Sequence, residues 1–107
     1  MGKDFRLSLL LEYYGPLITE KQRSLLDLYY NEDLSLAEIA QNEGITRQGV
    51  RDSIKKAETA LFSFEEKMHL AARFEKIESA LEKIRSITDD NEIIDIIDAV
   101  LKEEELE

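Results

Sequence analysis

The 107-residue sequence predicts an all-α fold, and three observations lead to that prediction. Every segment with a clear hydrophobic period repeats at about 3.6 residues, the helical period, and none alternates at period two over a useful length. Gly occurs 4 times and Pro once, so helix breakers are scarce and long helices are expected. The stretches TEKQ and SLAE have the pattern of capping boxes, which satisfy the free amides at the start of a helix.

The chain begins with two helices that a proline turn separates. Residues 4–14 place their apolar side chains on one broad stripe. Gly15-Pro16 ends this helix, because Pro cannot continue the hydrogen-bond ladder. The capping box over residues 19–22 then opens a second helix, which is expected to run to about residue 30.

A short helix and a long one follow. The capping box over residues 35–38 starts the short helix, and Gly44 stops it, since glycine readily takes the positive-φ conformation of a helix end. Thr46 is a good N-cap for the next helix, which contains no breaker. Its apolar residues form a heptad seam at spacings of 3 and 4, namely Val50, Ile54, Ala57, Leu61, Phe64, Met68 and Ala71.

The pattern continues into the C-terminal part, but one residue out of phase. The shifted positions are Phe74, Ile77, Leu81, Ile84 and Thr88. This slip predicts either a stammer or a break into a separate helix near residues 69–73. The acidic run over residues 89–92 is typical of a helix start and opens a final helix. The apolar face of that helix is Ile93, Ile94, Ile97, Val100 and Leu101.

These patterns suggest a helix-turn-helix domain over residues 1–69 and a helical dimerisation or packing segment over residues 70–107. The seam has more apolar surface than so small a bundle covers, which favours a homodimer. The expected dimer or packing seam consists of Leu61, Phe64, Met68, Phe74, Ile77, Leu81 and Ile84. The alternative is that residues 73–101 fold back as a hairpin and cover the seam within one chain.

Composition excludes several classes of protein. There is no cysteine, hence no disulfide framework, no thiol nucleophile and no Cys-based metal site. No apolar stretch approaches the ~18–20 residues that span a bilayer, and the N-terminus lacks a signal-peptide core, so we expect a cytoplasmic protein without membrane contact. His69 is the single histidine, and no serine has a readable His/Asp partnership. We therefore expect no enzyme, no cofactor and no metal.

Residues 35–57 form the informative motif, a short helix, a turn at Gly44 and a longer helix. Arg47, Gln48 and Arg51 lie on the outer face of the second helix, with side chains suited to base edges in a DNA major groove. The expected phosphate contacts are Lys21, Arg23, Lys55 and Lys56.

The distribution of charge allows DNA binding through one face only. The chain has a net charge of −10, but residues 44–56 hold four basic side chains against Asp52 alone. Asp52 would lie near phosphates, and Gly49 lowers helix propensity by ~0.5–1 kcal/mol relative to Ala. Gly49 is also consistent with close approach to another backbone, of the preceding helix or of DNA.

Residues 19–61 resemble region 4 of bacterial sigma factors, the module that reads the promoter −35 element. From Tyr13 onward, YYGPLITEKQRSLLDLYYNEDLSLAEIAQNEGITRQGVRDSIKKAE is similar to the YlxM family, small helix-turn-helix proteins encoded beside the signal recognition particle GTPase. The resemblance implies a sigma-region-4-like domain, dimerisation and a role in the signal recognition particle pathway. The usual SRQAVYDNIKR of the family is here TRQGVRDSIKK, with Gly49 for Ala and Arg51 for Tyr.

Three hypotheses follow for function. The preferred one is a dimeric regulator that binds double-stranded DNA through the helix beginning at Arg47. The alternative is a protein-binding adaptor that engages the signal recognition particle GTPase or RNA polymerase without DNA. A third idea is autoinhibition, in which the acidic tail 102–107 covers the basic stripe.

Overall fold

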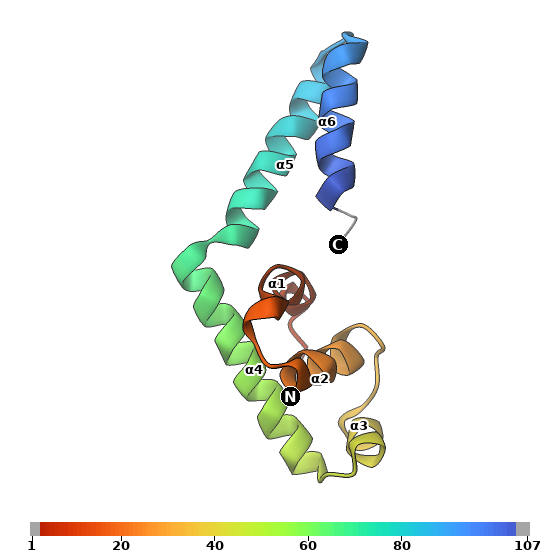
Figure 1. The fold of residues 1–107 in the computed structure, drawn as a ribbon, viewed down its shortest axis with the longest axis vertical. Helices are drawn as coiled ribbons and strands as arrows, with labels where there is room; N and C mark the ends of the chain where they lie inside the picture. The colour runs from red at the N-terminus through yellow and green to blue at the C-terminus, as the bar shows by residue number, and fades with distance from the viewer. Residues whose placement is uncertain (1–2, 105–107) are drawn as a thin grey trace. The chain divides into compact units, whose positions relative to one another are not determined.

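The computed structural model describes residues 3–104, with side chains through residue 102. In chain order the described elements are α1 (Arg6–Tyr14), the 3-10 turn η1 (Gly15–Leu17), α2 (Glu20–Tyr30), α3 (Leu36–Glu43), α4 (Arg47–Met68), α5 (Leu70–Ile87) and α6 (Asn91–Glu104) (Figure 1). The described part contains no strand, which confirms the all-α prediction. Most of the acidic tail 102–107 lies outside the described residues.

The chain divides into two compact units, one ending at Ala71 and the other beginning at Ala72. The boundary predicted from sequence lies two residues earlier. In the first unit α1, α2 and α3 all pack against α4 (Figure 1). The side of α4 that receives them is a stripe at spacings of 4, 3 and 4, composed of Val50, Ile54, Ala57 and Leu61, each with no exposed surface.

Helix starts in this unit have the predicted caps. Thr19 Oγ1 accepts a hydrogen bond from Gln22 N–H at 3.1 Å, and the Gln22 side chain accepts one from Thr19 N–H at 3.0 Å. Ser35 and Glu38 form the same reciprocal pair at 3.0 Å in each direction. Both capping boxes are therefore confirmed, and they fix where α2 and α3 enter the core.

Two tyrosines tie the N-terminal helices to α4 through hydrogen bonds. The Tyr14 hydroxyl donates to Glu65 Oε1 at 2.6 Å and accepts from Leu70 N–H at 3.0 Å. The Tyr30 hydroxyl donates to Glu58. Burial raises the pKa of both phenols, and the carboxylate partners raise it further, so both remain protonated donors near neutral pH.

The phase slip in the seam is a helix break rather than a stammer. His69 adopts the left-handed conformation, with φ of 58°, and separates α4 from α5. Glu65 Oε1 accepts Ala71 N–H at 3.0 Å, and Tyr14 accepts Leu70 N–H, so two orphan amides of α5 are satisfied by side chains. The side chains of Tyr14 on α1 and Glu65 on α4 therefore stabilise the break.

The second unit is a helical hairpin of α5 and α6. Arg85 on α5 donates to Asp98 on α6, with Nε–Oδ1 at 2.7 Å and Nη2–Oδ2 at 3.1 Å. The turn is held by Thr88 Oγ1, which accepts Asp90 N–H, and by Asp90 Oδ1, which accepts Glu92 N–H. Residues 73–101 therefore fold back as a hairpin, but Ile77 and Ile84 of the expected seam stay exposed, so the hairpin does not cover the whole seam.

Replacing Tyr14 with Phe should destabilise the first unit. The change removes a donor to Glu65 and an acceptor for Leu70 N–H at a buried position, which we expect to lower the free energy of unfolding by about 1–3 kcal/mol. Urea unfolding followed by circular dichroism measures this. Tyr29→Phe is the matched control, because Tyr29 is also buried but its hydroxyl forms no hydrogen bond within the described residues. Equal losses in the two variants would contradict the assigned role of Tyr14.

Candidate nucleic-acid interface

The helix-turn-helix motif is built from α3, the turn at Gly44 and the first turns of α4. Gly44 adopts φ of 68°, the left-handed conformation that ends α3, and Ile45 N–H donates to the Ala40 carbonyl at 3.2 Å. Thr46 then caps α4, because its Oγ1 accepts Gly49 N–H at 3.0 Å. Both predictions, for the glycine stop and for the threonine cap, are confirmed.

Burial on one side of α4 decides which side chains face outward. Val50 and Ile54 are fully buried against the other helices. Arg47, Gln48 and Arg51 are exposed in consequence. These three side chains and Leu36 of α3 line one hollow of about 360 Å³. The structure thus brings together the three residues that the sequence predicted for base contact, and it adds Leu36, whose half-buried position the sequence did not single out.

The charges in this hollow are open to a ligand. Arg47 and Arg51 take part in none of the ion pairs found within residues 3–102. Gln48 Nε2 donates to Asp52 Oδ1 at 2.9 Å. Asp52 therefore holds the Gln48 amide in one orientation, with the carbonyl oxygen and the second N–H left over for other partners. Asp52, a carboxylate that is unfavourable near phosphates, thus orients the Gln48 side chain in this structure.

Gly49 is explained by the cap rather than by a neighbouring backbone. A methyl group at Gly49 would lie 3.1 Å from Thr46 Oγ1 and 3.9 Å from Ile45 Cδ1, and both of these atoms belong to side chains of the turn. No backbone atom of α3 lies within 4 Å of such a methyl group, so of the two possibilities that the sequence left open, the preceding helix does not account for Gly49. Because Gly49 has no side chain, the Thr46 hydroxyl has room to cap the helix.

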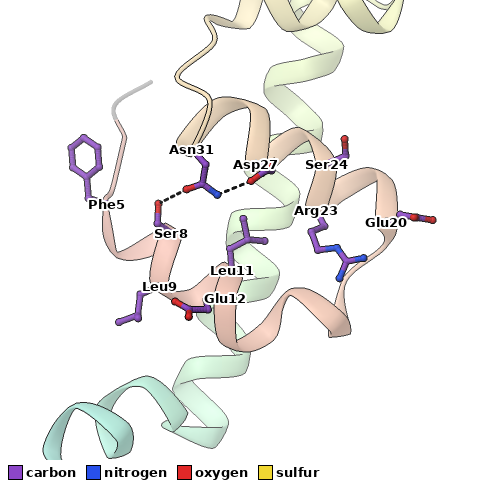
Figure 2. Close-up of a pocket in the computed structure, with 10 residues that line it drawn as sticks. All are labelled: Phe5, Ser8, Leu9, Leu11, Glu12, Glu20, Arg23, Ser24, Asp27 and Asn31. Atoms are coloured by element: carbon purple, nitrogen blue, oxygen red, sulfur yellow. Dashed lines mark hydrogen bonds between the residues drawn. The ribbon is translucent and has the colours of Figure 1, made fainter. Parts of the chain in front are cut away.

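The residues predicted to contact phosphate lie on different elements. Lys55 and Lys56 are exposed on α4, two turns beyond the start of the helix. Lys21 is exposed on α2. Arg23 is exposed too, but it lines a separate groove between α1 and α2 (Figure 2). Three carboxylates, Glu12, Glu20 and Asp27, line the same groove, so the surroundings of Arg23 are unfavourable for a phosphate.

The predicted seam residues divide between two environments. Leu61 is buried in the first unit, and the Phe64 ring lies 5.9 Å from the Tyr14 ring, so both belong to the packing of that unit. Phe74 and Leu81 on α5 are half-buried. The exposed members are Met68, Ile77 and Ile84.

Other chemistry finds little support in the described part of the chain. Residues 3–102 contain no group of three His, Asp or Glu side chains placed to hold a metal ion. None of the helices within residues 3–104 combines the length and the apolar character needed to cross a bilayer.

The fold and the exposed face of α4 define a helix-turn-helix protein. Over residues 1–100 the sequence matches the family described as "Putative helix-turn-helix protein, YlxM / p13 like". The chain belongs to this family, as its resemblance to YlxM implied. It is 43% identical over 108 residues to a UPF0122 protein of Clostridium kluyveri, covering 100% of this chain and 88% of the relative.

Two further relatives are comparably similar. A UPF0122 protein of Desulforamulus reducens is 43% identical over 88 residues, which cover 81% of this chain and 75% of the relative. One of Oceanobacillus iheyensis is 41% identical over 93 residues, with 87% and 89% covered. The similarity therefore includes most of both units rather than the motif alone.

Removing the cap of α4 should weaken the motif. Thr46→Ala loses the bond to Gly49 N–H, and we expect the free energy of unfolding to fall by about 0.5–2 kcal/mol. Thr59→Ala is the control, since Thr59 is exposed on the same helix and bonds only the Lys55 carbonyl. Urea unfolding compares the two, and a larger loss for Thr59→Ala would contradict the importance of this cap.

Proposed function

We propose that this protein binds double-stranded DNA and acts as a transcription regulator, with the N-terminal turns of α4 in the major groove. The supporting observation is the hollow lined by Arg47, Gln48 and Arg51, in which both guanidinium groups lack an ion-pair partner among the described residues. Arginine suits guanine O6 and N7, and an amide suits adenine. Lys55 and Lys56 extend this surface toward the DNA backbone. Such a function implies a cytoplasmic protein.

Two substitutions should separate base reading from backbone contact. Arg51→Ala should weaken binding to a selected duplex by ~1–3 kcal/mol and relax base preference at one position. Lys55→Ala should weaken all sequences about equally and lower the dependence on salt. Selection from random duplexes, followed by titrations at two salt concentrations, measures both effects. Lys67→Ala provides the control, because Lys67 is exposed in the last turn of α4.

If Arg51→Ala and Lys67→Ala change affinity by the same amount, the proposed reading face is wrong. The second candidate function would then be favoured, a protein-binding adaptor for the signal recognition particle GTPase or RNA polymerase. The net charge of −10 supports this candidate, because an acidic body suits a basic protein better than DNA. A complex with that GTPase that duplex DNA fails to displace would distinguish the adaptor from the regulator.

We also propose a homodimer formed through the hairpin of the second unit. On α6, Ile97 is buried and Ile94 and Leu101 are half-buried, whereas Ile93, Ile96 and Val100, each one position earlier, are exposed. α5 has a similar arrangement: Leu81 is half-buried, whereas Ile77, Ile84 and Ile87 are exposed.

These two exposed stripes fall on one side of the hairpin. In an antiparallel pair, a shift of one residue toward the N-terminus on each helix turns both stripes to the same face. Each helix therefore has two apolar stripes, but only one of them packs against the other helix of the hairpin. A second hairpin on this face completes a four-helix bundle, and it would present two reading helices to DNA.

A charge on the exposed stripe should prevent this association. Ile96 is 59% exposed, so Ile96→Glu leaves the packing of the hairpin intact and places a carboxylate in the proposed interface. We expect sedimentation to show a dimer for the natural chain and an increase of about ten-fold or more in the dimer dissociation constant for the variant. Ser79→Glu, exposed on another side of α5, should leave the dimer unchanged. A monomeric natural chain would contradict the proposal.

A further inference from the structure

The α1/α2 groove is a second surface feature, separate from the reading face. It has a volume of about 890 Å³ and is lined by Phe5, Ser8, Leu9, Leu11, Glu12, Glu20, Arg23, Ser24, Asp27 and Asn31. Figure 2 shows the residues of α1 along one wall and those of α2 along the other. No residue of this lining belongs to the hollow at α4, so the two surfaces are able to act independently.

Two of the apolar side chains that line the groove are exposed to solvent. Leu9 on α1 is 40% exposed, and Phe5, the N-cap residue four positions earlier, is 76% exposed. Leu11, which is buried, forms the base between the helices. Two exposed anchors one turn apart next to an apolar base match the way in which a groove receives the apolar face of a helix.

Hydrogen bonds and a close contact within the chain fix the two walls of the groove. The Ser8 hydroxyl on α1 donates to Asn31 Oδ1 at 3.4 Å, and Asn31 Nδ2 donates to Asp27 Oδ1 on α2 at 2.7 Å (Figure 2). On the other side, the Arg23 side chain lies against Gly15, where an added Cβ would meet Arg23 Cδ at 3.2 Å. A ligand would therefore meet a groove that is already shaped, with little ordering cost.

The charge of the lining selects the ligand. Glu12, Glu20 and Asp27 face one cation, Arg23, so the groove is acidic overall. Neither Glu12 nor Glu20 forms an ion pair within residues 3–102, so both carboxylates are available to lysine or arginine. The same carboxylates repel the phosphates of a nucleic acid. A second copy of this chain, at net −10, is also a poorly matched occupant.

We infer that the α1/α2 groove docks a short amphipathic helix of a partner protein, with two apolar side chains one turn apart and lysine or arginine on its flanks. The 9 residues of α1 extend over about 13 Å at ~1.5 Å per residue, so two to three turns of the partner helix fit along it. Leu9 and Phe5 contact the apolar side chains, while Glu12 and Glu20 pair with the flanking cations. This inference does not depend on DNA binding.

Fluorescence anisotropy on the full chain tests this inference. The probe is a labelled lysine-rich helical peptide of about three turns with leucines at i and i+4. Glu12→Lys with Glu20→Lys should weaken binding about ten-fold or more, since each lost pair and each new like-charge contact reduces affinity. The control is Glu43→Lys with Glu66→Lys, the same charge change at exposed positions outside the groove, and it should weaken binding less than about three-fold.

A second variant tests the apolar contact at constant charge. Leu9→Ser should weaken peptide binding by about five- to ten-fold, and the peptide with both leucines replaced by alanine should bind the natural chain equally poorly. The inference is overturned if both double variants lose affinity equally, since general acidity then explains binding, or if the alanine peptide binds as well as the leucine peptide. It is overturned as well if Leu9→Ser dissociates the natural dimer in sedimentation, because the groove would then be occupied by a second copy.

Discussion

The first unit depends on one constraint, the complete burial of the inner stripe of α4. Val50, Ile54, Ala57 and Leu61 have no exposed surface, and α1, α2 and α3 all pack on them. Once other helices cover this stripe, the opposite side of α4 is the side that faces solvent. Burial of hydrocarbon therefore determines that Arg51 and Gln48 point to solvent. The surface proposed for DNA is a consequence of core packing, since Gln48 and Arg51 face outward because Val50 and Ile54 face inward.

Much of this arrangement was predictable from local patterns. Thr19, Ser35 and Thr46 are caps in the structure because a hydroxyl three residues before a free amide satisfies it irrespective of tertiary contacts. Gly44 likewise has its expected left-handed conformation. The grouping of Arg47, Gln48 and Arg51 in one hollow follows from helical spacing, which sequence alone supplies.

What the sequence left undetermined depends on contacts between distant residues. The phase slip after Met68 was compatible with a stammer or a break, and the break is fixed by Tyr14, which lies more than fifty residues earlier and bonds both Glu65 and Leu70. Arg23 was expected at a phosphate because it is basic. Glu20 and Asp27 lie on the same helix as Arg23, at a spacing that the sequence already shows, whereas Glu12 comes from α1 and joins them only when α1 and α2 are packed together.

The distribution of charge explains how an acidic chain is compatible with the proposal. The cations of residues 44–56 are on the outward face of one motif, whereas the carboxylates of the groove belong to α1 and α2. Because exposed charges more than about 8–10 Å apart are largely screened at physiological salt, each surface acts through its own local charge. The net charge of −10 then lowers nonspecific affinity for DNA without preventing a local contact.

The most direct measurement is an amide chemical-shift titration of the full chain with a duplex selected from random DNA. If this face binds DNA, the largest shifts fall at Leu36 and over residues 46–52, with small changes in α1 and in the hairpin. Shifts concentrated in the α1/α2 groove or the hairpin, with the start of α4 unchanged, would contradict the assignment of this face to DNA.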